Sequence, residues 1–383
     1  MKKVVFIIES LQCGGAEKSL ITLLNLLDYS VFQVDLILFN SGGEFEKFVP
    51  KEVTIINKPL FKNVNVFNKF YKKIEFWILR KFTKNKHTAQ NFWNAYQHLI
   101  NTHAVYYDVA IAYNQGFATY YLATKMSASK KIAWVNTDYQ KAGYNAAIDF
   151  QFYKKLNTIV AVSEECKQSL KAAFNNYNLN ATIEVIPDIL DTTTIKEKAG
   201  SKIENLNFDT NLINIVTVGR LAEVKGYQLA INACKILVER GFSIKWYVIG
   251  EGSEREKLEK HIKNSNLENV FNLIGYKENP YPYINTCDIY VQTSLFEGLG
   301  LTLIEASILN KPIVSTNFPT AFSILEPNKT GLIAAMDAVS IADAIQTIIE
   351  NDDLKNKLIE NLKKQKNTRK EESISLVNKL LLS

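Results

Sequence analysis

The feature that most constrains the fold of this 383-residue chain is a repeated alternation of short apolar runs with helical stretches. Within each run the apolar residues are almost continuous, and polar or turn residues bound the run. Strands of this kind are buried on both faces, as in parallel sheets that helices cover on both sides. The predicted strands are Val4–Ile8, Val34–Phe39, Val53–Ile56, Val109–Tyr113, Ile132–Val135, Ile159–Val162, Ile183–Ile186, Ile213–Val218, Ile244–Ile249, Val270–Ile274, Ile289–Gln292, Ile313–Ser315 and Gly331–Ile333.

The predicted strands fall into two series, separated by a polar stretch that has no clear period. A chain of 383 residues is long enough for two domains of ordinary size. We therefore expect two Rossmann-like doubly wound α/β domains, at residues 1–190 and 212–364, joined by a linker at 191–211. We also expect the lysine-rich segment after about residue 365 to form a helix that packs on the first domain.

Composition places the chain among ordinary soluble globular proteins, with 47% apolar and 22% charged residues. The apolar run inside Met1–Glu9 is shorter than the roughly 7–15 residues of a signal peptide, so we interpret it as a first strand. No run of about 18 apolar residues predicts a membrane span. The cysteines lie far apart without a CxxC pair, which is typical of reduced thiols in a cytoplasmic protein. They are Cys13, Cys166, Cys234 and Cys287.

The segment Lys58–Lys86 is strongly basic, with nine lysines or arginines and Glu75 as its only acid. Aromatic and aliphatic residues are interleaved with these charges. One interpretation is a solvated basic helix whose aromatic residues pack on the domain. The other is a surface that contacts anionic lipid headgroups, with its aromatic residues at the interface. No motif supports nucleic-acid binding.

Two helix starts can be read from local pattern. Ser163 is placed to cap a helix that begins near Glu164. Ser253 and Glu256 have the spacing of a capping box. The motifs that carry chemistry all come directly after predicted strands, and the carboxyl ends of parallel strands line the natural binding crevice of such sheets.

Gly14 and Gly15 follow the first predicted strand and open a helix. Two glycines allow a ligand to approach the backbone closely, and a helix N-terminus offers free N–H groups. The pattern differs from the GxGxxG of dinucleotide-binding proteins. It indicates either a binding loop or only a tight turn between strand and helix.

Gly219, Arg220 and Lys225 follow the predicted strand Ile213–Val218. A guanidinium binds phosphate oxygens through two parallel hydrogen bonds, and an ammonium adds a mobile point charge. Together the two cations could neutralise the charge that develops on a departing diphosphate. The alternative is a pair of surface cations near acids such as Glu223.

Two carboxylates lie on either side of a glycine-rich turn, Glu297 on the loop and Glu305 within the next helix. A pair of carboxylates is also found in glycosidases, which hold them about 5–10 Å apart. A glutamate at the buried edge of a helix needs hydrogen-bond donors, and sugar or ribose hydroxyls are suitable. Between the glutamates lie Gly298, Leu299, Gly300, Leu301 and Thr302, and the N–H groups of the last two could hold phosphate.

These motifs resemble those of the retaining family 4 glycosyltransferases, and the resemblance covers almost the whole chain. Its most specific part is EGLGLTLIEA, which begins at Glu297 and contains Glu305 after seven intervening residues. Supporting blocks are GGAEKS at 14–19, VGRLAEVKG at 218–226, VIGEGSER at 248–255 and DIYVQTSLFEG at 288–298. The resemblance implies the GT-B fold, in which an acceptor-binding domain and a donor-binding domain face each other across a cleft.

The resemblance also implies roles for single residues. Arg220 and Lys225 would hold the donor diphosphate, Glu297 would lie beside the donor sugar, and Glu305 would bind the ribose. The predicted catalytic residues are Glu297, Arg220 and Lys225, and the predicted substrate-binding residues are Gly14, Gly15, Asn136, Gly219, Gly275, Tyr276, Gly298, Leu299, Gly300, Leu301, Thr302 and Glu305. Gly275 and Tyr276 would border the base, whereas Gly14 and Gly15 would approach the diphosphate and the acceptor.

Members of the family transfer a sugar from a nucleotide diphosphate to a hydroxyl group without a metal or other cofactor. We expect a UDP-sugar in preference to a GDP-sugar, a glycan or lipid-linked acceptor, and a place in cell-surface polysaccharide synthesis. One departure stands at Asn136, where the family often has a histidine. Asparagine can hydrogen-bond a sugar hydroxyl but does not titrate near neutral pH.

Two alternatives remain open at this point. Related folds also serve sugar-nucleotide epimerases and phosphorylases, which differ in their products. A degenerate transferase could persist as a binding or scaffold subunit, and Asn136 is the one feature that favours this. A dehydrogenase is disfavoured, because the dinucleotide fingerprint and its acidic partner are missing.

Overall fold

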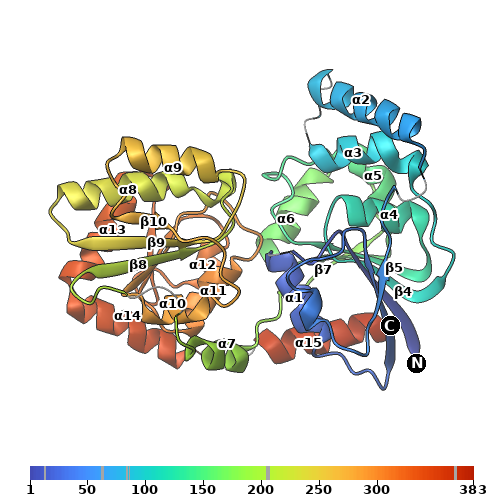
Figure 1. Cartoon of the computed structure of the whole chain (residues 1–383). Helices are drawn as coiled ribbons and strands as arrows, with labels where there is room; N and C mark the ends of the chain where they lie inside the picture. Colours follow the sequence, from blue (N-terminus) through green and yellow to red (C-terminus); the bar gives the residue numbers. More distant parts are fainter. Residues whose placement is uncertain (13, 62–63, 83–84, 86, 204–207, 366–368) are drawn as a thin grey trace. The chain divides into compact units, whose positions relative to one another are not determined.

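A computed structural model describes residues 1–12, 14–61, 64–82, 85, 87–203, 208–365 and 369–383. The chain forms two compact units (Figure 1). The first consists of Met1–Leu190 together with Arg369–Ser383, and the second of Asp191–Thr368. Each unit is an α/β structure built on a parallel sheet.

The first unit contains a seven-stranded sheet in the order β3-β2-β1-β4-β5-β6-β7. All of its strand pairs are parallel. The order reverses between β1 and β4, which is the topological switch point where ligands bind in doubly wound sheets. The strands are β1 (Lys2–Ile8), β2 (Phe32–Leu38), β3 (Thr54–Asn57), β4 (Tyr106–Ala112), β5 (Ser127–Val135), β6 (Thr158–Ala161) and β7 (Thr182–Val185).

The second unit contains a six-stranded sheet in the order β10-β9-β8-β11-β12-β13. Its pairs are also parallel, and its switch point lies between β8 and β11. The strands are β8 (Ile213–Val218), β9 (Ile244–Ile249), β10 (Phe271–Leu273), β11 (Ile289–Gln292), β12 (Ile313–Thr316) and β13 (Leu332–Ala334).

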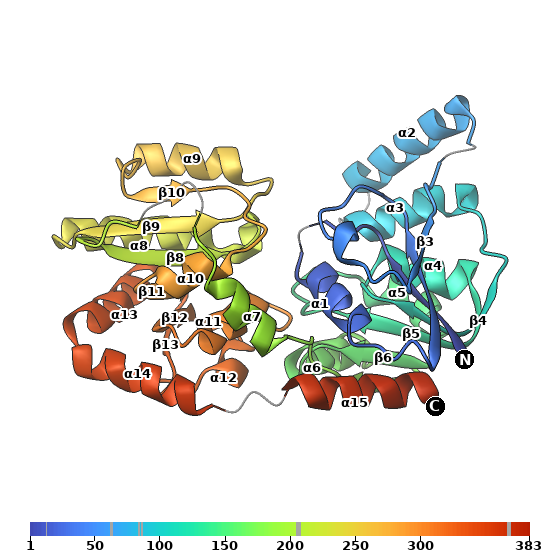
Figure 2. The same cartoon turned by 60° about the horizontal axis from the view of Figure 1, so that its bottom comes forward.

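Helices connect the parallel strands in both units (Figures 1 and 2). In the first unit they are α1 (Gly15–Leu24), α2 (Val66–Phe82), α3 (Thr88–Tyr96), α4 (Phe117–Lys125), α5 (Ala146–Tyr153), α6 (Glu164–Ala173) and, from the end of the chain, α15 (Arg369–Leu382). In the second unit they are α7 (Thr192–Ala199), α8 (Tyr227–Glu239), α9 (Arg255–Asn264), α10 (Tyr281–Thr286), α11 (Leu301–Ile308), α12 (Ala321–Ile324), α13 (Ala338–Glu350) and α14 (Asp352–Lys364). Short 3-10 helices occur at Glu46–Phe48, Gln97–Leu99 and Glu223–Lys225.

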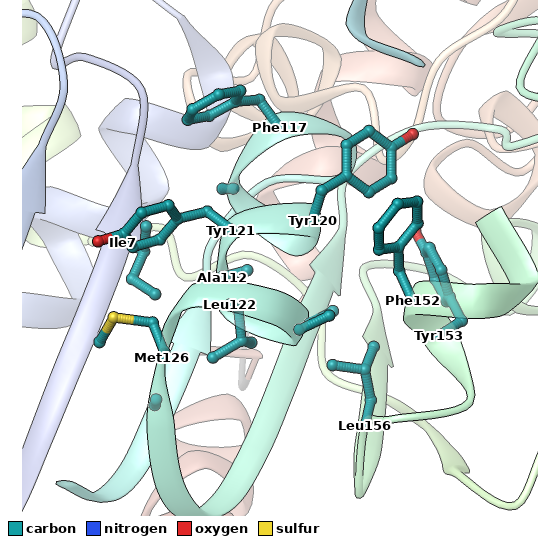
Figure 3. Packing of buried hydrophobic residues seen from close by; sticks show 14 of the residues in the cluster. Ile7, Ala112, Phe117, Tyr120, Tyr121, Leu122, Met126, Phe152, Tyr153 and Leu156 are labelled. Atoms are coloured by element: carbon teal, nitrogen blue, oxygen red, sulfur yellow. The ribbon is translucent and has the colours of Figure 1, made fainter. Parts of the chain in front are cut away.

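The core of the first unit is rich in aromatic side chains, several of them on α4 and α5 (Figure 3). Tyr120 on α4 packs against Phe152 on α5, with ring centroids 4.5 Å apart. The hydroxyl of Tyr120 donates a 2.7 Å hydrogen bond to the buried Asp149. Burial raises the pKa of Asp149 to about 6. Asp149 and its hydrogen-bond donors are therefore paired with each other inside the core. We assign Asp149 a structural role.

The sequence predicted the strands well. Each of the predicted segments overlaps a strand of the two sheets, and the prediction of two Rossmann-like doubly wound units is confirmed. The interval 191–211, predicted as a linker, contains the helix α7, which the pattern did not indicate. Ser163 caps α6 as predicted, since its Oγ accepts from the N–H of Cys166. The predicted capping box is wrong, because α9 begins at Arg255 without a side-chain cap.

Among the described residues, the helices are all too short or too polar to cross a membrane. Cys166, Cys234 and Cys287 are buried and form no disulfide with one another, and Cys13 lies outside the described residues.

Candidate sugar-nucleotide site

The second unit gathers predicted site residues at the switch point of its sheet. The neighbouring strands β8 and β11 end at Val218 and Gln292, and their following loops carry Arg220, Lys225 and Glu297. Hydrogen bonds fix the strand ends: Thr217 Oγ1 donates to the carbonyl of Val291 at 2.7 Å and accepts from the indole of Trp246 at 3.0 Å. The site is therefore built on rigid, buried strands.

The loop after β8 is held close to the loop after β9. The N–H of Gly219 donates to the carbonyl of Ile249, and the hydroxyl of Tyr227 donates to the carbonyl of Gly219 at 2.8 Å. Gly250 has a φ of +151°, and a Cβ there would lie 2.0 Å from the carbonyl oxygen of Gly219. A glycine is required at this contact because the two backbones touch.

A second close approach joins the loop after β8 to the loop after β11. Gly226 is left-handed, with a φ of +62°, and begins α8. A Cβ on it would lie 2.1 Å from the carbonyl oxygen of Thr293. Thr293 Oγ1 donates to the carbonyl of Lys225 at 3.0 Å, and the N–H of Leu295 donates to that of Val224 at 2.8 Å. These contacts bring Lys225 to the loop that carries Glu297.

Lys225 and Glu297 form an ion pair, with Nζ and Oε1 2.6 Å apart. The same carboxylate oxygen accepts hydrogen bonds from Gln292 Nε2 at 3.0 Å and Ser294 Oγ at 2.5 Å. Gln292 in turn accepts a 3.0 Å hydrogen bond from Thr302 Oγ1 on α11. A lysine ammonium has three donors, so this ion pair leaves it with capacity for an additional acceptor such as a phosphate oxygen.

Arg220 is exposed, and its side chain forms no hydrogen bond or ion pair with any other described residue. The structure thus brings Lys225 and Glu297 into direct contact but leaves Arg220 outside this network. Arg220 follows β8 on the same loop as Lys225, and its exposed side chain is accessible to a ligand.

The glycine-rich turn before α11 is largely buried. Gly298, Leu299 and Gly300 are buried, and Leu301 and Thr302 are half-buried. Gly300 caps the helix in a left-handed conformation, with a φ of +79°. The N–H groups of the first helical residues have no acceptor within the helix, so they suit an anion at this end.

Glu305 lies inside α11 with 1% of its surface exposed. Its Oε1 accepts a hydrogen bond from the hydroxyl of Tyr281 on α10 at 3.2 Å. A buried carboxylate with a protein donor is stable in the fold without a ligand, so burial alone does not assign it to a ribose.

Gly275 and Tyr276 follow β10, beside the loop after β9. Gly275 has a φ of +77°, and its carbonyl accepts from the N–H of Gly250 at 3.0 Å. Glu251, on the loop after β9, forms an ion pair with Arg255, with Oε1 and Nη2 2.7 Å apart. These contacts position the backbone of Gly275 along the same edge of the sheet as Gly219.

In the first unit, predicted site residues follow β1 at the switch point and β5, the strand next to β4. Gly14 caps α1, and Asn136 follows β5. The N–H of Asn136 donates to Gln115 Oε1 at 2.9 Å, and its Nδ2 donates to the carbonyl of Tyr113 at 2.8 Å. Its Oδ1 is buried and accepts no hydrogen bond within the described part of the chain. Asn136 is thus an acceptor placed at the end of a central strand, where a ligand hydroxyl could donate to it.

Glu9 was missed by the sequence reasoning. It follows β1 directly, and burial raises the pKa of its carboxyl to about 7, with a smaller contribution from the carboxylate of Glu17. A hydrogen bond from the backbone of Ala118 and one from Asn114 oppose this shift. The signal was present, because an acid that directly follows an apolar strand at a switch point is placed for binding.

Comparisons with known proteins bear on the second unit most directly. Residues 199–365 match the sequence profile of the family described as Glycosyl transferases group 1. This match places the similarity to group 1 glycosyltransferases in the second unit. The matched region contains all three predicted catalytic residues. Within the described ranges, no three or more His, Cys, Asp or Glu side chains are grouped so that they could hold a metal ion.

Two relatives extend the similarity. The chain is 28% identical over 201 residues to an uncharacterized glycosyltransferase of Methanocaldococcus jannaschii. The aligned region covers 50% of this chain and 49% of that protein. It is 27% identical over 370 residues to the Campylobacter jejuni N-acetylgalactosamine-N,N'-diacetylbacillosaminyl-diphospho-undecaprenol 4-alpha-N-acetylgalactosaminyltransferase. This alignment covers 93% of the chain and 92% of the Campylobacter protein. The chain therefore spans about half the length of the first relative and nearly all of the second.

The solved structure of Anabaena HepE with UDP-glucose superposes with a TM-score of 0.70 at 16% identity, over 100% of this chain and 98% of that one. At this identity the likeness concerns the fold. The chain has the GT-B fold with two Rossmann-like units, and the region matched by the group 1 profile lies in the second of them.

Proposed function

We propose that this chain is a retaining family 4 glycosyltransferase that transfers a sugar from a nucleotide diphosphate to a hydroxyl of a glycan or lipid-linked acceptor. The observation that carries the proposal is the contact of Lys225 with Glu297 at the switch point of the second unit. A cation for a diphosphate and a carboxylate for a sugar are thereby held side by side. We propose a UDP-sugar as donor in preference to a GDP-sugar, with no metal.

The chemistry follows from the charges that change during transfer. The bond between the anomeric carbon and the diphosphate oxygen breaks, and a bond from that carbon to the acceptor oxygen forms on the same face. Lys225 and Arg220 stabilise the negative charge that the leaving diphosphate gains. A diphosphate oxygen takes the acceptor proton, and Glu297 orients the sugar while positive charge develops on its ring. Glu305 accepts hydrogen bonds from the ribose.

The proposed setting is cell-surface polysaccharide synthesis in the cytoplasm. The name of the Campylobacter relative includes a diphospho-undecaprenol-linked sugar, which supports a lipid-linked acceptor. Asn136 and Glu9, after β5 and β1 of the first unit, are proposed to bind acceptor hydroxyls, since both present oxygen acceptors there.

Two measurements test the proposal. The first is a thermal-shift series with UDP-, GDP- and ADP-sugars, in which UDP-sugars are expected to stabilise the protein most. The second is NMR analysis of the product's anomeric configuration, in which retention is expected. Glu297→Gln is expected to lower kcat by about 100-fold or more while UDP binding persists. Glu268→Gln, on an exposed residue of the same unit, is the matched control.

Any other outcome of these measurements would contradict a specific part of the proposed function. Full activity of Glu297→Gln removes the role of that residue. An inverted product removes the retaining mechanism, and a released isomer of the sugar nucleotide would identify an epimerase. Binding of a UDP-sugar without hydrolysis or transfer would identify a binding subunit.

A further inference from the structure

Helix α2 (Val66–Phe82) is attached to the first unit along one narrow stripe. Phe76 packs against Phe92 and Tyr96 beside it, with ring centroids 5.9 Å and 6.1 Å apart. Figures 1 and 2 show α2 on the outside of the unit, next to α3. No residue of α2 is buried. The helix is therefore held in place while most of its circumference faces outward.

The outward side of α2 is apolar. Its large apolar residues are 42% to 80% exposed, and they are Val66, Phe67, Phe70, Tyr71, Ile74, Trp77, Ile78 and Phe82. With about 3.6 residues per turn, these positions fill a continuous arc of roughly 160° around the helix. The one polar residue within that arc is Lys81. A contiguous exposed face of this kind marks an interaction site.

The charge on α2 indicates which kind of partner binds its apolar face. The helix carries five basic residues and one acid, and the acid, Glu75, is paired with Lys72 at 2.6 Å. Lys69, Lys73 and Arg80 fall together on the helical wheel along one margin of the apolar arc. Lys81 lies over the ring of Trp77, with Nζ 4.8 Å from the centroid. The surface thus combines exposed aromatic side chains with a strong positive charge.

We propose that the apolar face of α2 inserts into the headgroup region of an anionic lipid bilayer and docks the first unit there. Aromatic residues prefer the membrane interface, and a basic margin is attracted to anionic headgroups. A second copy of the chain is a poorer occupant, because a two-fold contact through this face would bring two sets of cations together. The proposal is independent of the proposed glycosyl transfer, since α2 contributes no predicted catalytic residue.

Trp77 makes the test specific. It is 54% exposed, whereas Trp93, Trp134 and Trp246 are at most 2% exposed. Quenching of tryptophan fluorescence by brominated lipids therefore reports insertion of α2. We expect quenching with vesicles of equal phosphatidylcholine and brominated phosphatidylglycerol at low salt, and far less with brominated phosphatidylcholine alone. Raising the salt concentration should weaken the interaction.

The matched variants separate charge from apolar insertion. Replacing Lys69, Lys73 and Arg80 with glutamine is expected to weaken vesicle binding by about 100-fold, from roughly a fivefold effect per basic residue near the surface. Replacing Lys357, Lys363 and Lys364 of α14 removes the same charge elsewhere and should leave binding nearly unchanged. Phe67→Ser with Phe70→Ser should abolish the quenching, and Phe322→Ser, at an exposed site of the second unit, should preserve it.

Absence of quenching in the wild-type protein would overturn the proposal. Equal losses in the α2 and α14 charge variants would also overturn it, because they would show attraction without a defined face. A lipid-free dimer that shields Trp77 would assign the face to a second copy instead. All replaced side chains are exposed or half-exposed, so circular dichroism of each variant should match that of the wild type.

Discussion

The ion pair between Lys225 and Glu297 allows the most direct quantitative test of the candidate site. The paired atoms are 2.6 Å apart, and the side chains retain 20% and 13% exposure. At an effective dielectric constant of about 20, two unit charges at this distance attract by about 6 kcal/mol. Loss of hydration offsets much of this, so that a charged hydrogen bond contributes a net stabilisation of about 2 kcal/mol.

The perturbation is a double-mutant cycle of Lys225→Met and Glu297→Gln. When Lys225 is replaced, Glu297 keeps its hydrogen bonds from Gln292 and Ser294. We therefore expect each single variant to destabilise the surrounding loops by about 2–3 kcal/mol, below the cost for a fully buried unpaired charge. The expected coupling energy is about 2 kcal/mol.

The assay is native-state hydrogen exchange by mass spectrometry on peptides that contain β8 and β11. A loss of 2 kcal/mol corresponds to exchange that is about 30-fold faster where local opening controls the rate. The control cycle uses the surface pair Arg240 and Asp343, at 2.7 Å but with 33% and 57% exposure, for which coupling below about 1 kcal/mol is expected. Additive effects at Lys225 and Glu297, within about 0.3 kcal/mol, would refute the reasoning.

Three other predictions follow from described features. Gly226→Ala should destabilise the second unit by about 3 kcal/mol, or roughly 5–10 °C in thermal midpoint, because it adds a backbone clash to an unfavourable φ. Gly241→Ala, with a φ of +87° but open space around it, should cost about 1 kcal/mol, and an equal effect of both would contradict the clash. The first unit should lose stability as pH rises from 4.5 to about 7, since the folded state holds the Glu9 proton more tightly than the unfolded chain. Thermal unfolding of Glu9→Gln should show a shallower slope, because only the raised pKa of groups such as Asp149 then remains, and an unchanged slope would assign it to those other groups. The three buried thiols, whose pKa values burial raises to about 12, should resist alkylation near neutral pH until the chain unfolds, as peptide mapping would show.

The strands were predictable because their information is local. An unbroken apolar run bounded by turns has few structural outcomes. The helix α7 was harder, because only Ile195 and Ala199 of its eight residues are buried and its polar composition resembles a linker. Its one local signal was Asp191, whose carboxylate caps the helix by accepting from two N–H groups.

The candidate site was predictable in composition but not in its contacts. Spacing placed Glu297 on a loop and Glu305 in a helix, and the structure agrees. The pairing of Lys225 with Glu297 joins residues 72 positions apart and depends on β8 lying beside β11, so no local pattern contained it. Arg220 and Lys225 were expected to act alike, yet only the lysine has an ionic partner among the described residues.

The chain's final helix has a consequence for biosynthesis. α15 belongs to the unit formed by the first 190 residues, where Lys130 donates a 2.8 Å hydrogen bond to the carbonyl of Leu380. Once the chain has emerged from the ribosome up to Thr368, the whole second unit is outside, but the first unit still lacks α15. The second unit can therefore complete its fold earlier during translation, although its sequence begins later.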